Sequence, residues 1–358
     1  MDASSALKTM ACVDTTARGF GSDNHSGIHP HILDALVSVN SGHRPSYGTD
    51  PLAHAARARF KEVLGPNAEA FFVFNGTAAN VLCLESLVRP HQSVLCANTS
   101  HLWLDECGAP ERHIGCKLVP VQGHLGKLRP ADLEPHLIRG GDQHFSQPGA
   151  ISITQPTEFG TCYTLDELQH LVSFAREHSL KVHVDGARLG NAAAHLNTSL
   201  SALSGQLGID ALSFGGTKNG LFGAEAVVLF DPDTADGFRY RRKQAMQLPS
   251  KTRFVAAQFD AYLRNDLWKA IASHANEQAL RLRSKIEKNP AITLPYPTES
   301  NAVFAVIPKG WVKPLKRTHF FYVWDTDPCL IRLMTSFDTS EAEIDSFAAN
   351  MVAQPFSA

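Results

Sequence analysis

Ser213-Phe-Gly-Gly-Thr-Lys-Asn-Gly220 (SFGGTKNG) is the most informative segment of this sequence. It places Lys218 in a glycine-rich turn directly after a short apolar run, which is the pattern of a buried strand that ends in a tight loop. Because small neighbours let a ligand come close, such a lysine can lose part of its hydration and become a nucleophilic amine. The alternative is a solvated lysine in a surface turn. The first interpretation predicts that Lys218 forms a Schiff base.

Short apolar runs alternate with helical patterns around this segment. Thr164 and Glu167 form a capping box, which predicts a helix that ends near His178. The alternation predicts an α/β fold whose mostly parallel sheet is covered by helices on both faces. The predicted strands are Phe71–Phe74, Ser93–Ala97, Ala150–Thr154, Lys181–Val184, Ala211–Phe214 and Ala224–Phe230.

Four polar residues, Asn75, Glu158, Asp185 and Lys218, come just after predicted strands. In sheets of this kind, ligands bind beyond the carboxyl ends of the strands. We therefore expect these four side chains to gather at one site.

The chain divides into three predicted segments. Residues 1–20 lack periodicity and are expected to form a tail, 21–250 a large α/β domain, and 251–358 a smaller α+β domain. The elements predicted for the smaller domain are a helical region at 253–288, strands at Ala302–Ile307, His319–Val323 and Leu330–Thr335, and a helix from Ser340.

Composition excludes several classes of protein. The 358 residues carry a net charge of −2, without the basic excess of a nucleic-acid binder. No apolar stretch is long enough to span a bilayer, and the N-terminus lacks the apolar core of a secretory signal. The seven cysteines are scattered without CxxC pairs, which predicts reduced thiols, no metal site and a cytoplasmic location.

The segment His183-Val-Asp-Gly-Ala-Arg188 is the second chemical signal. A carboxylate at a strand end, followed by small residues, can reach a buried heterocycle. Pyridoxal 5'-phosphate (PLP) needs such a group beside its pyridine nitrogen, because the protonated ring is what accepts electrons from the substrate. The alternative is that Asp185 only caps the next helix.

The turn Asn75-Gly-Thr-Ala-Ala-Asn80 is the third signal. A small strand-to-helix turn offers free backbone N–H groups and the positive end of a helix dipole, both of which suit a phosphate. The turn matches neither GxxxxGK[ST] nor GxGxxG, so nucleotide and dinucleotide binding are disfavoured.

The order of phosphate turn, aspartate and lysine resembles the fold-type-I PLP enzymes, and in detail the threonine aldolase family. The resemblance implies an aspartate-aminotransferase-like fold and L-specific cleavage of β-hydroxy-α-amino acids, with PLP as the cofactor. The matching segments are Ser22–Asn24, Ser46–Asp50, Gly76–Asn80, His101, Gln155–Gly160, His183–Arg188, Phe214–Gly220 and Arg332–Asp338.

The resemblance also implies a role for individual residues. Lys218 corresponds to the Schiff-base lysine, Asp185 to the partner of the pyridine nitrogen, and His101 to the histidine that stacks on the ring. The remaining cofactor-binding residues that it implies are Gly76, Thr77, Arg188 and Thr217, and the substrate-binding residues are Ser22, Tyr47, Arg188 and Arg332.

The basic stretch at 239–251 has two interpretations. It can be a solvated helix face, or it can supply Lys243 and Lys251 to the phosphate of a neighbouring subunit, as the family resemblance implies. The resemblance implies a homo-oligomer, specifically a tetramer built from dimers with shared active sites.

Glu158 stands where better-known bacterial threonine aldolases carry a histidine. His101 and Glu158 are therefore both candidates for the base that removes the β-hydroxyl proton. The predicted activity is cleavage of L-threonine, L-allo-threonine or phenylserine-like substrates to glycine and an aldehyde. The alternatives are transamination, β-elimination, racemisation or a catalytically silent PLP-binding protein, because PLP supports all of these reactions.

Overall fold

The computed structural model describes residues 19–352 of the chain. Its centre is a seven-stranded sheet with the strand order β1-β7-β6-β5-β4-β2-β3. Only β7 runs antiparallel to its neighbours, so the predicted mostly parallel α/β sheet is confirmed. The strands are β1 (Glu69–Val73), β2 (Gln92–Ala97), β3 (Lys117–Val121), β4 (Gln147–Thr154), β5 (Lys181–Gly186), β6 (Ala211–Gly215) and β7 (Glu225–Leu229).

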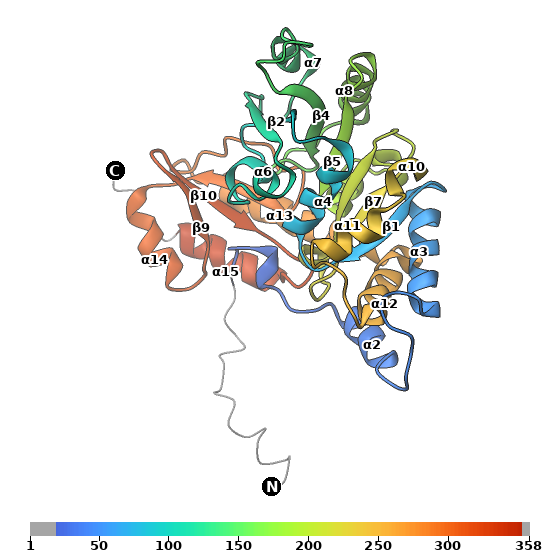
Figure 1. Cartoon of the computed structure of the whole chain (residues 1–358). Helices are drawn as coiled ribbons and strands as arrows, with labels where there is room; N and C mark the ends of the chain where they lie inside the picture. Colours follow the sequence, from blue (N-terminus) through green and yellow to red (C-terminus); the bar gives the residue numbers. More distant parts are fainter. Residues whose placement is uncertain (1–18, 353–358) are drawn as a thin grey trace.

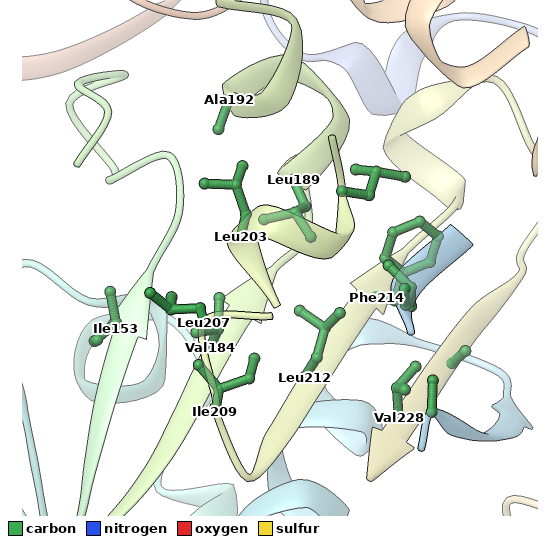
Figure 2. Packing of buried hydrophobic residues seen from close by; sticks show 14 of the residues in the cluster. Ile153, Val184, Leu189, Ala192, Leu203, Leu207, Ile209, Leu212, Phe214 and Val228 are labelled. Atoms are coloured by element: carbon green, nitrogen blue, oxygen red, sulfur yellow. The ribbon is translucent and has the colours of Figure 1, made fainter. Parts of the chain in front are cut away.

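Helices cover both faces of this sheet, as the apolar strands require. On one face α3 (Pro51–Leu64), α8 (Leu165–Glu177), α9 (Leu189–His195) and α12 (Thr252–Leu263) share the main hydrophobic core with the strands. Figure 2 shows part of this core, where side chains from neighbouring strands point toward α9. On the other face, α4 (Gly76–Leu87) packs on the strands together with α6 (Ala109–Ile114) and α11 (Phe238–Gln244).

Strand periodicity separates core residues from site residues. Val184 points into the core, so its neighbours His183 and Asp185 point to the face that α4 covers. On the adjacent strand, Leu212 and Phe214 likewise leave Ser213 on the α4 face. The polar positions of β5 and β6 therefore meet on one side of the sheet.

A second, three-stranded antiparallel sheet has the order β8-β10-β9 and lies to one side of the large sheet (Figure 1). Phe20 is buried in its core, and its backbone bonds both Phe320 and Met334. The rest of the predicted tail, residues 1–18, lies outside the described residues. The strands are β8 (Ala302–Val306), β9 (Tyr322–Thr326) and β10 (Cys329–Met334), and the helices packed with them include α13 (Leu267–Ile286), α14 (Val312–Lys316) and α15 (Glu341–Val352).

Two strand predictions differ from the structure. The strand predicted at His319–Val323 begins only at Tyr322, and the edge strand β3 has no counterpart among the predicted strands. The core of the large sheet includes Val255 and continues to Ile271. The remaining helices are α2 (Pro30–Ser38), α5 (His101–Leu104), α7 (Pro130–Leu133), α10 (Pro232–Ala235) and the short 3-10 turns η2 (Asp23–His25), η3 (Glu134–His136), η4 (Ser201–Leu203), η5 (Thr217–Asn219), η6 (Arg264–Asp266) and η7 (Lys309–Trp311).

No helix in residues 19–352 combines the length and the apolar character needed to cross a membrane.

Phe60 ties α3 to the sheet and to α12. Its ring is fully buried and lies 5.5 Å from the ring of Phe214 and 5.2 Å from that of Phe259. Phe60→Ala should lower the free energy of unfolding by about 3–5 kcal/mol, measured by urea denaturation, because it leaves a cavity in the core. Ile138→Ala is the control: Ile138 is 81% exposed, so that change should have little effect.

Candidate active site

A cleft of about 980 Å³ opens at the carboxyl edge of the parallel strands and reaches the small sheet. Ten of the predicted site residues line it: Ser22, Gly76, Thr77, His101, Glu158, Asp185, Arg188, Thr217, Lys218 and Arg332. They come from segments that are far apart in the sequence, as the strand-end prediction requires.

Lys218 lies in η5, in the turn between β6 and the antiparallel β7. The turn needs its glycines, because a Cβ on Gly215 would lie 2.4 Å from the carbonyl oxygen of Ala187, and one on Gly216 would lie 2.5 Å from that of Ala224. The positive charge of Arg188 and then burial lower the pKa of the Lys218 amine. Both effects favour the neutral, nucleophilic form.

Asp185 is the last residue but one of β5 and is only 5% exposed. Asn80 of α4 donates a hydrogen bond from Nδ2 to Asp185 Oδ2 at 2.9 Å. Burial on its own raises the pKa of Asp185, but Lys218, the Asn80 hydrogen bond and nearby histidines together hold it below the ordinary value. Asp185 is therefore an anionic carboxylate inside the cleft.

The start of α4 provides the anion-binding feature expected of the phosphate turn. Asn75 Oδ1 accepts a hydrogen bond from the Ala78 amide at 2.9 Å, which fixes the first turn of the helix. Gly76 and Thr77 are the first helical residues, whose amides have no carbonyl partner within a helix. A Cβ on Gly76 would meet no atom within 4 Å, so the backbone there is open to a ligand.

His101 and Glu158 lie next to each other at the cleft. The backbone N–H of His101 donates to Glu158 Oε1 at 2.8 Å, and His101 Nδ1 lies 2.9 Å from Glu106 Oε1. The hydrogen bond to Glu106 raises the pKa of His101. Glu158 is half-buried as a residue, but its Oε2 is buried without a partner among the described residues, and burial raises its pKa to about 7.

The two predicted carboxylate-binding arginines differ in their surroundings. Arg188 uses Nε and Nη2 to bind both oxygens of Asp23, at 2.5 and 2.9 Å. Within residues 19–352, Arg332 donates a single long hydrogen bond of 3.4 Å to the Gly21 carbonyl, and its guanidinium lies 4.8 Å from the centre of the Trp324 ring. Arg332 therefore keeps more of its donors for a ligand than Arg188 does.

Tyr47, Lys243 and Lys251 do not line this cleft. They lie together elsewhere, since Lys243 Nζ is 5.5 Å from the centre of the Tyr47 ring and the Tyr47 amide bonds the Ser250 carbonyl, next to Lys251. Within one chain, none of these three residues belongs to the lining of the cleft.

Two polar residues of the site, Asp23 and Glu225, had no role predicted from the sequence. Asp23 belongs to a quoted motif, and its pairing with Arg188 depends on a contact between distant segments. Glu225 begins β7 beside Lys218, accepts a hydrogen bond from the Thr217 amide at 3.2 Å, and burial raises its pKa to about 7. Because β7 is antiparallel, its first residue lies at the edge where the parallel strands end, and no local signal in the sequence shows this.

The family model described as beta-eliminating lyase matches residues 19–309. The low specificity L-threonine aldolase of Pseudomonas aeruginosa is 39% identical over 333 residues, which cover 93% of this chain and 96% of that protein. The chain belongs to the beta-eliminating lyase family, among the threonine aldolases. The predicted family, the PLP cofactor and the class of carbon–carbon lyase are therefore confirmed.

Two further comparisons show how much of the chain is similar to a threonine aldolase and how much to a racemase. The solved structure of a Leishmania major threonine aldolase superposes with a TM-score of 0.89 at 29% identity, covering 94% of this chain and 98% of that one. The alanine racemase TOXG of Cochliobolus carbonum is 36% identical over 144 residues, which cover 40% of this chain and 35% of that protein. The aldolase likeness thus extends over nearly the whole chain, and the racemase likeness over less than half.

Glu158 should make the stability of the cofactor-free protein depend on pH. With a pKa of about 7 when folded and near 4.5 when unfolded, Glu158 favours the folded state fully below pH 4.5, and this contribution is lost as pH rises to 7. The loss is at most about 3 kcal/mol. Glu158→Gln cannot ionise, so urea unfolding should show the variant gaining stability relative to wild type between pH 4.5 and 7. A constant difference over that range contradicts the prediction.

Proposed function

We propose that this chain cleaves L-threonine, L-allo-threonine and related L-β-hydroxy-α-amino acids to glycine and an aldehyde. The observation that carries the proposal is the cleft that brings together an amine of lowered pKa, a buried carboxylate and an arginine with free donors. The names of the full-length relatives support the same activity.

The residues of the cleft fit PLP. Lys218 would hold its aldehyde carbon, Asp185 would face its ring nitrogen, and the amides of Gly76 and Thr77 would hold its phosphate. PLP supplies a protonated ring that accepts the electron pair left at Cα when the Cα–Cβ bond breaks. An anionic Asp185 would keep that ring nitrogen protonated.

Arg332 would bind the substrate carboxylate, because a guanidinium and a carboxylate form paired hydrogen bonds. Arg188 would have mainly a supporting role in binding the substrate carboxylate, since two of its nitrogens already donate to Asp23. Ser22 lines the same part of the cleft and would contact the substrate from η2.

Release of the aldehyde requires loss of the β-hydroxyl proton. His101 Nε2 would accept this proton, because its Nδ1 is occupied by Glu106 and its pKa is raised. Glu158, with a pKa of about 7, would hold the His101 backbone in place and assist the proton transfer. The reverse assignment, with Glu158 as the base, is open to the test below.

The protein would work in the cytoplasm as a homotetramer built from dimers. Sharing of sites between subunits is supported by the position of Tyr47, Lys243 and Lys251, which do not line the cleft of their own chain. In a dimer these residues would serve the site of the neighbouring subunit.

The activity is tested by incubating the purified protein with L-threonine in the absence of a keto acid. We expect acetaldehyde and glycine in equal amounts, and borohydride reduction should fix PLP covalently on Lys218 in a peptide map. Lys218→Ala should abolish turnover, because the variant cannot hold the cofactor covalently.

Other outcomes of this assay distinguish the alternatives. Stoichiometric conversion of the cofactor to its amine form, with release of a keto acid, would make the protein an aminotransferase. Loss of optical activity from L-alanine without cleavage of threonine would favour the racemase relationship. A reduced cofactor on any other lysine contradicts the assignment of Lys218.

Arg332→Ala should lower kcat/KM for threonine by at least about tenfold, because it removes a paired contact to a carboxylate. The absorption spectrum of the cofactor should stay unchanged. Arg332→Lys keeps the charge but not the paired geometry. Its kcat/KM should therefore lie between that of wild type and that of Arg332→Ala. Near-wild-type kinetics for Arg332→Ala would contradict the assignment of Arg332 to the substrate carboxylate.

The proton acceptor is identified by comparing two variants. His101→Asn should lose more of kcat than Glu158→Gln, because a positioned base typically contributes about 10²–10⁴-fold. Glu158→Gln should also keep the acidic limb of the kcat profile, which His101 controls in this scheme. If Glu158→Gln is the more damaged enzyme, or its acidic limb disappears, the two roles are exchanged.

A further inference from the structure

Glu106 belongs to a buried hydrogen-bond chain that joins two residues of the cleft. Its Oε1 lies 2.9 Å from His101 Nδ1 and accepts a hydrogen bond from Asn80 Nδ2 at 2.7 Å. The same Asn80 nitrogen donates to Asp185 Oδ2 at 2.9 Å. The chain therefore runs from His101 through Glu106 and Asn80 to Asp185.

The orientation of the Asn80 amide is forced by its neighbours. Its nitrogen faces two carboxylate oxygens, one from Glu106 and one from Asp185. A flipped amide would direct its own oxygen at both carboxylate oxygens and take the amide donor away from each of them. Asn80 is 3% exposed, so water cannot readily replace the lost hydrogen bonds.

Glu106 has one counter-charge among the described residues, and that is His101. Its side chain is fully buried, and its only ion pair is the contact with His101 Nδ1. Its second oxygen, Oε2, is buried without a hydrogen-bond partner in the described part of the chain. A proton on His101 therefore relieves the cost of a buried carboxylate, which couples the two groups.

The pairing also selects one tautomer of His101. A carboxyl group is a far weaker base than imidazole, so the proton between Glu106 and His101 belongs to Nδ1. The neutral ring then has its lone pair on Nε2, an atom that bonds no residue of the described chain. Nε2 is thus the atom of His101 that can accept a proton in the cleft.

We propose that Glu106 is a positioning residue for the aldolase reaction, which holds His101 as the Nδ1–H tautomer with Nε2 free to accept the β-hydroxyl proton. Through Asn80 it also shares a donor with Asp185. One network therefore orients both the base and the carboxylate assigned to the ring nitrogen. This inference rests on the proposed function, which assigns His101 as the base. Glu106 is added to that assignment as the residue that positions the base.

The charged groups around His101 determine the direction of the pH effect. The hydrogen bond to Glu106 raises the pKa of His101, burial lowers it, Asp185 raises it and Lys218 lowers it. Glu158 accepts a hydrogen bond from the His101 backbone on the opposite side. Because Glu106 is the largest influence, its neutralisation should lower the pKa and make His101 a weaker base.

The test is Glu106→Gln in the PLP-loaded enzyme, which keeps a carbonyl acceptor for Asn80 while removing the charge. NMR of ¹⁵N-labelled histidine, with His101 identified through His101→Asn, should show that the pKa of His101 falls. kcat for threonine should drop by at least about tenfold, with its acidic limb moved to lower pH. The cofactor spectrum should stay unchanged, which separates loss of the base from loss of the cofactor.

Glu111→Gln is the matched control, since Glu111 is a nearby carboxylate in α6 without a hydrogen bond to His101. It should leave both the His101 pKa and kcat unchanged. In wild type, the ¹⁵N shifts of neutral His101 should show a protonated Nδ1 and an unprotonated Nε2, and this reading needs no variant. The opposite tautomer, or an unchanged His101 pKa or kcat in Glu106→Gln, would overturn the proposal.

Failure of the proposed function is distinguishable from failure of this inference. If wild type does not cleave threonine, the aldolase proposal fails, while the tautomer and pKa of His101 still decide whether Glu106 controls its protonation.

Discussion

A series of neighbouring buried charged groups at the carboxyl edge of the large sheet is what the rest of the site depends on. Asp185 and Lys218 occupy neighbouring strand ends, where each influences the pKa of the other. Lys218 is in turn next to Arg188, whose own charge is matched by both oxygens of Asp23. Removing Arg188 or Asp23 alone would leave its partner as an unpaired buried charge, and that is costly in a protein interior. The series also lowers the pKa of Asp185, which keeps this carboxylate anionic, and it lowers the pKa of the Lys218 amine.

Arg188 and Arg332 are the same residue type, but their surroundings give them different roles. Arg188 is bound by Asp23, which Asn301 also holds through a hydrogen bond of 3.1 Å to Oδ2, so Arg188 is part of the framework. Arg332 instead stacks on Trp324 in the small sheet and has a buried Nε without a partner among the described residues. An arginine held by a ring rather than by a carboxylate keeps its charge available to a ligand.

The residues that the sequence could predict are those whose role follows from local pattern. Lys218 and Asp185 follow apolar runs, and the turn at Gly76 lies between an apolar run and a helix, so their common position at one sheet edge was predictable from their places after strand ends. Glu106 and Glu225 were not predictable, because the first depends on the packing of α4 against the loop after α5, and the second on the direction of β7. Tyr47, Lys243 and Lys251 were selected by resemblance, and in the structure none of them lines the cleft of its own chain.

The antiparallel strand β7 has a further consequence for the spacing of the site. It is inserted between β1 and β6, so the strand that leads to the Gly76 turn and the strand that leads to Lys218 are two positions apart, whereas β5 and β6 are adjacent. With about 4.8 Å between strands, the turn lies roughly 10 Å from the lysine along the sheet edge, and the Asp185 strand lies about 5 Å beyond it. Backbone hydrogen bonds set these intervals. Exchanging side chains in the cleft can therefore change which bond of a substrate is broken, but accepting a cofactor of another length would require a different order of strands.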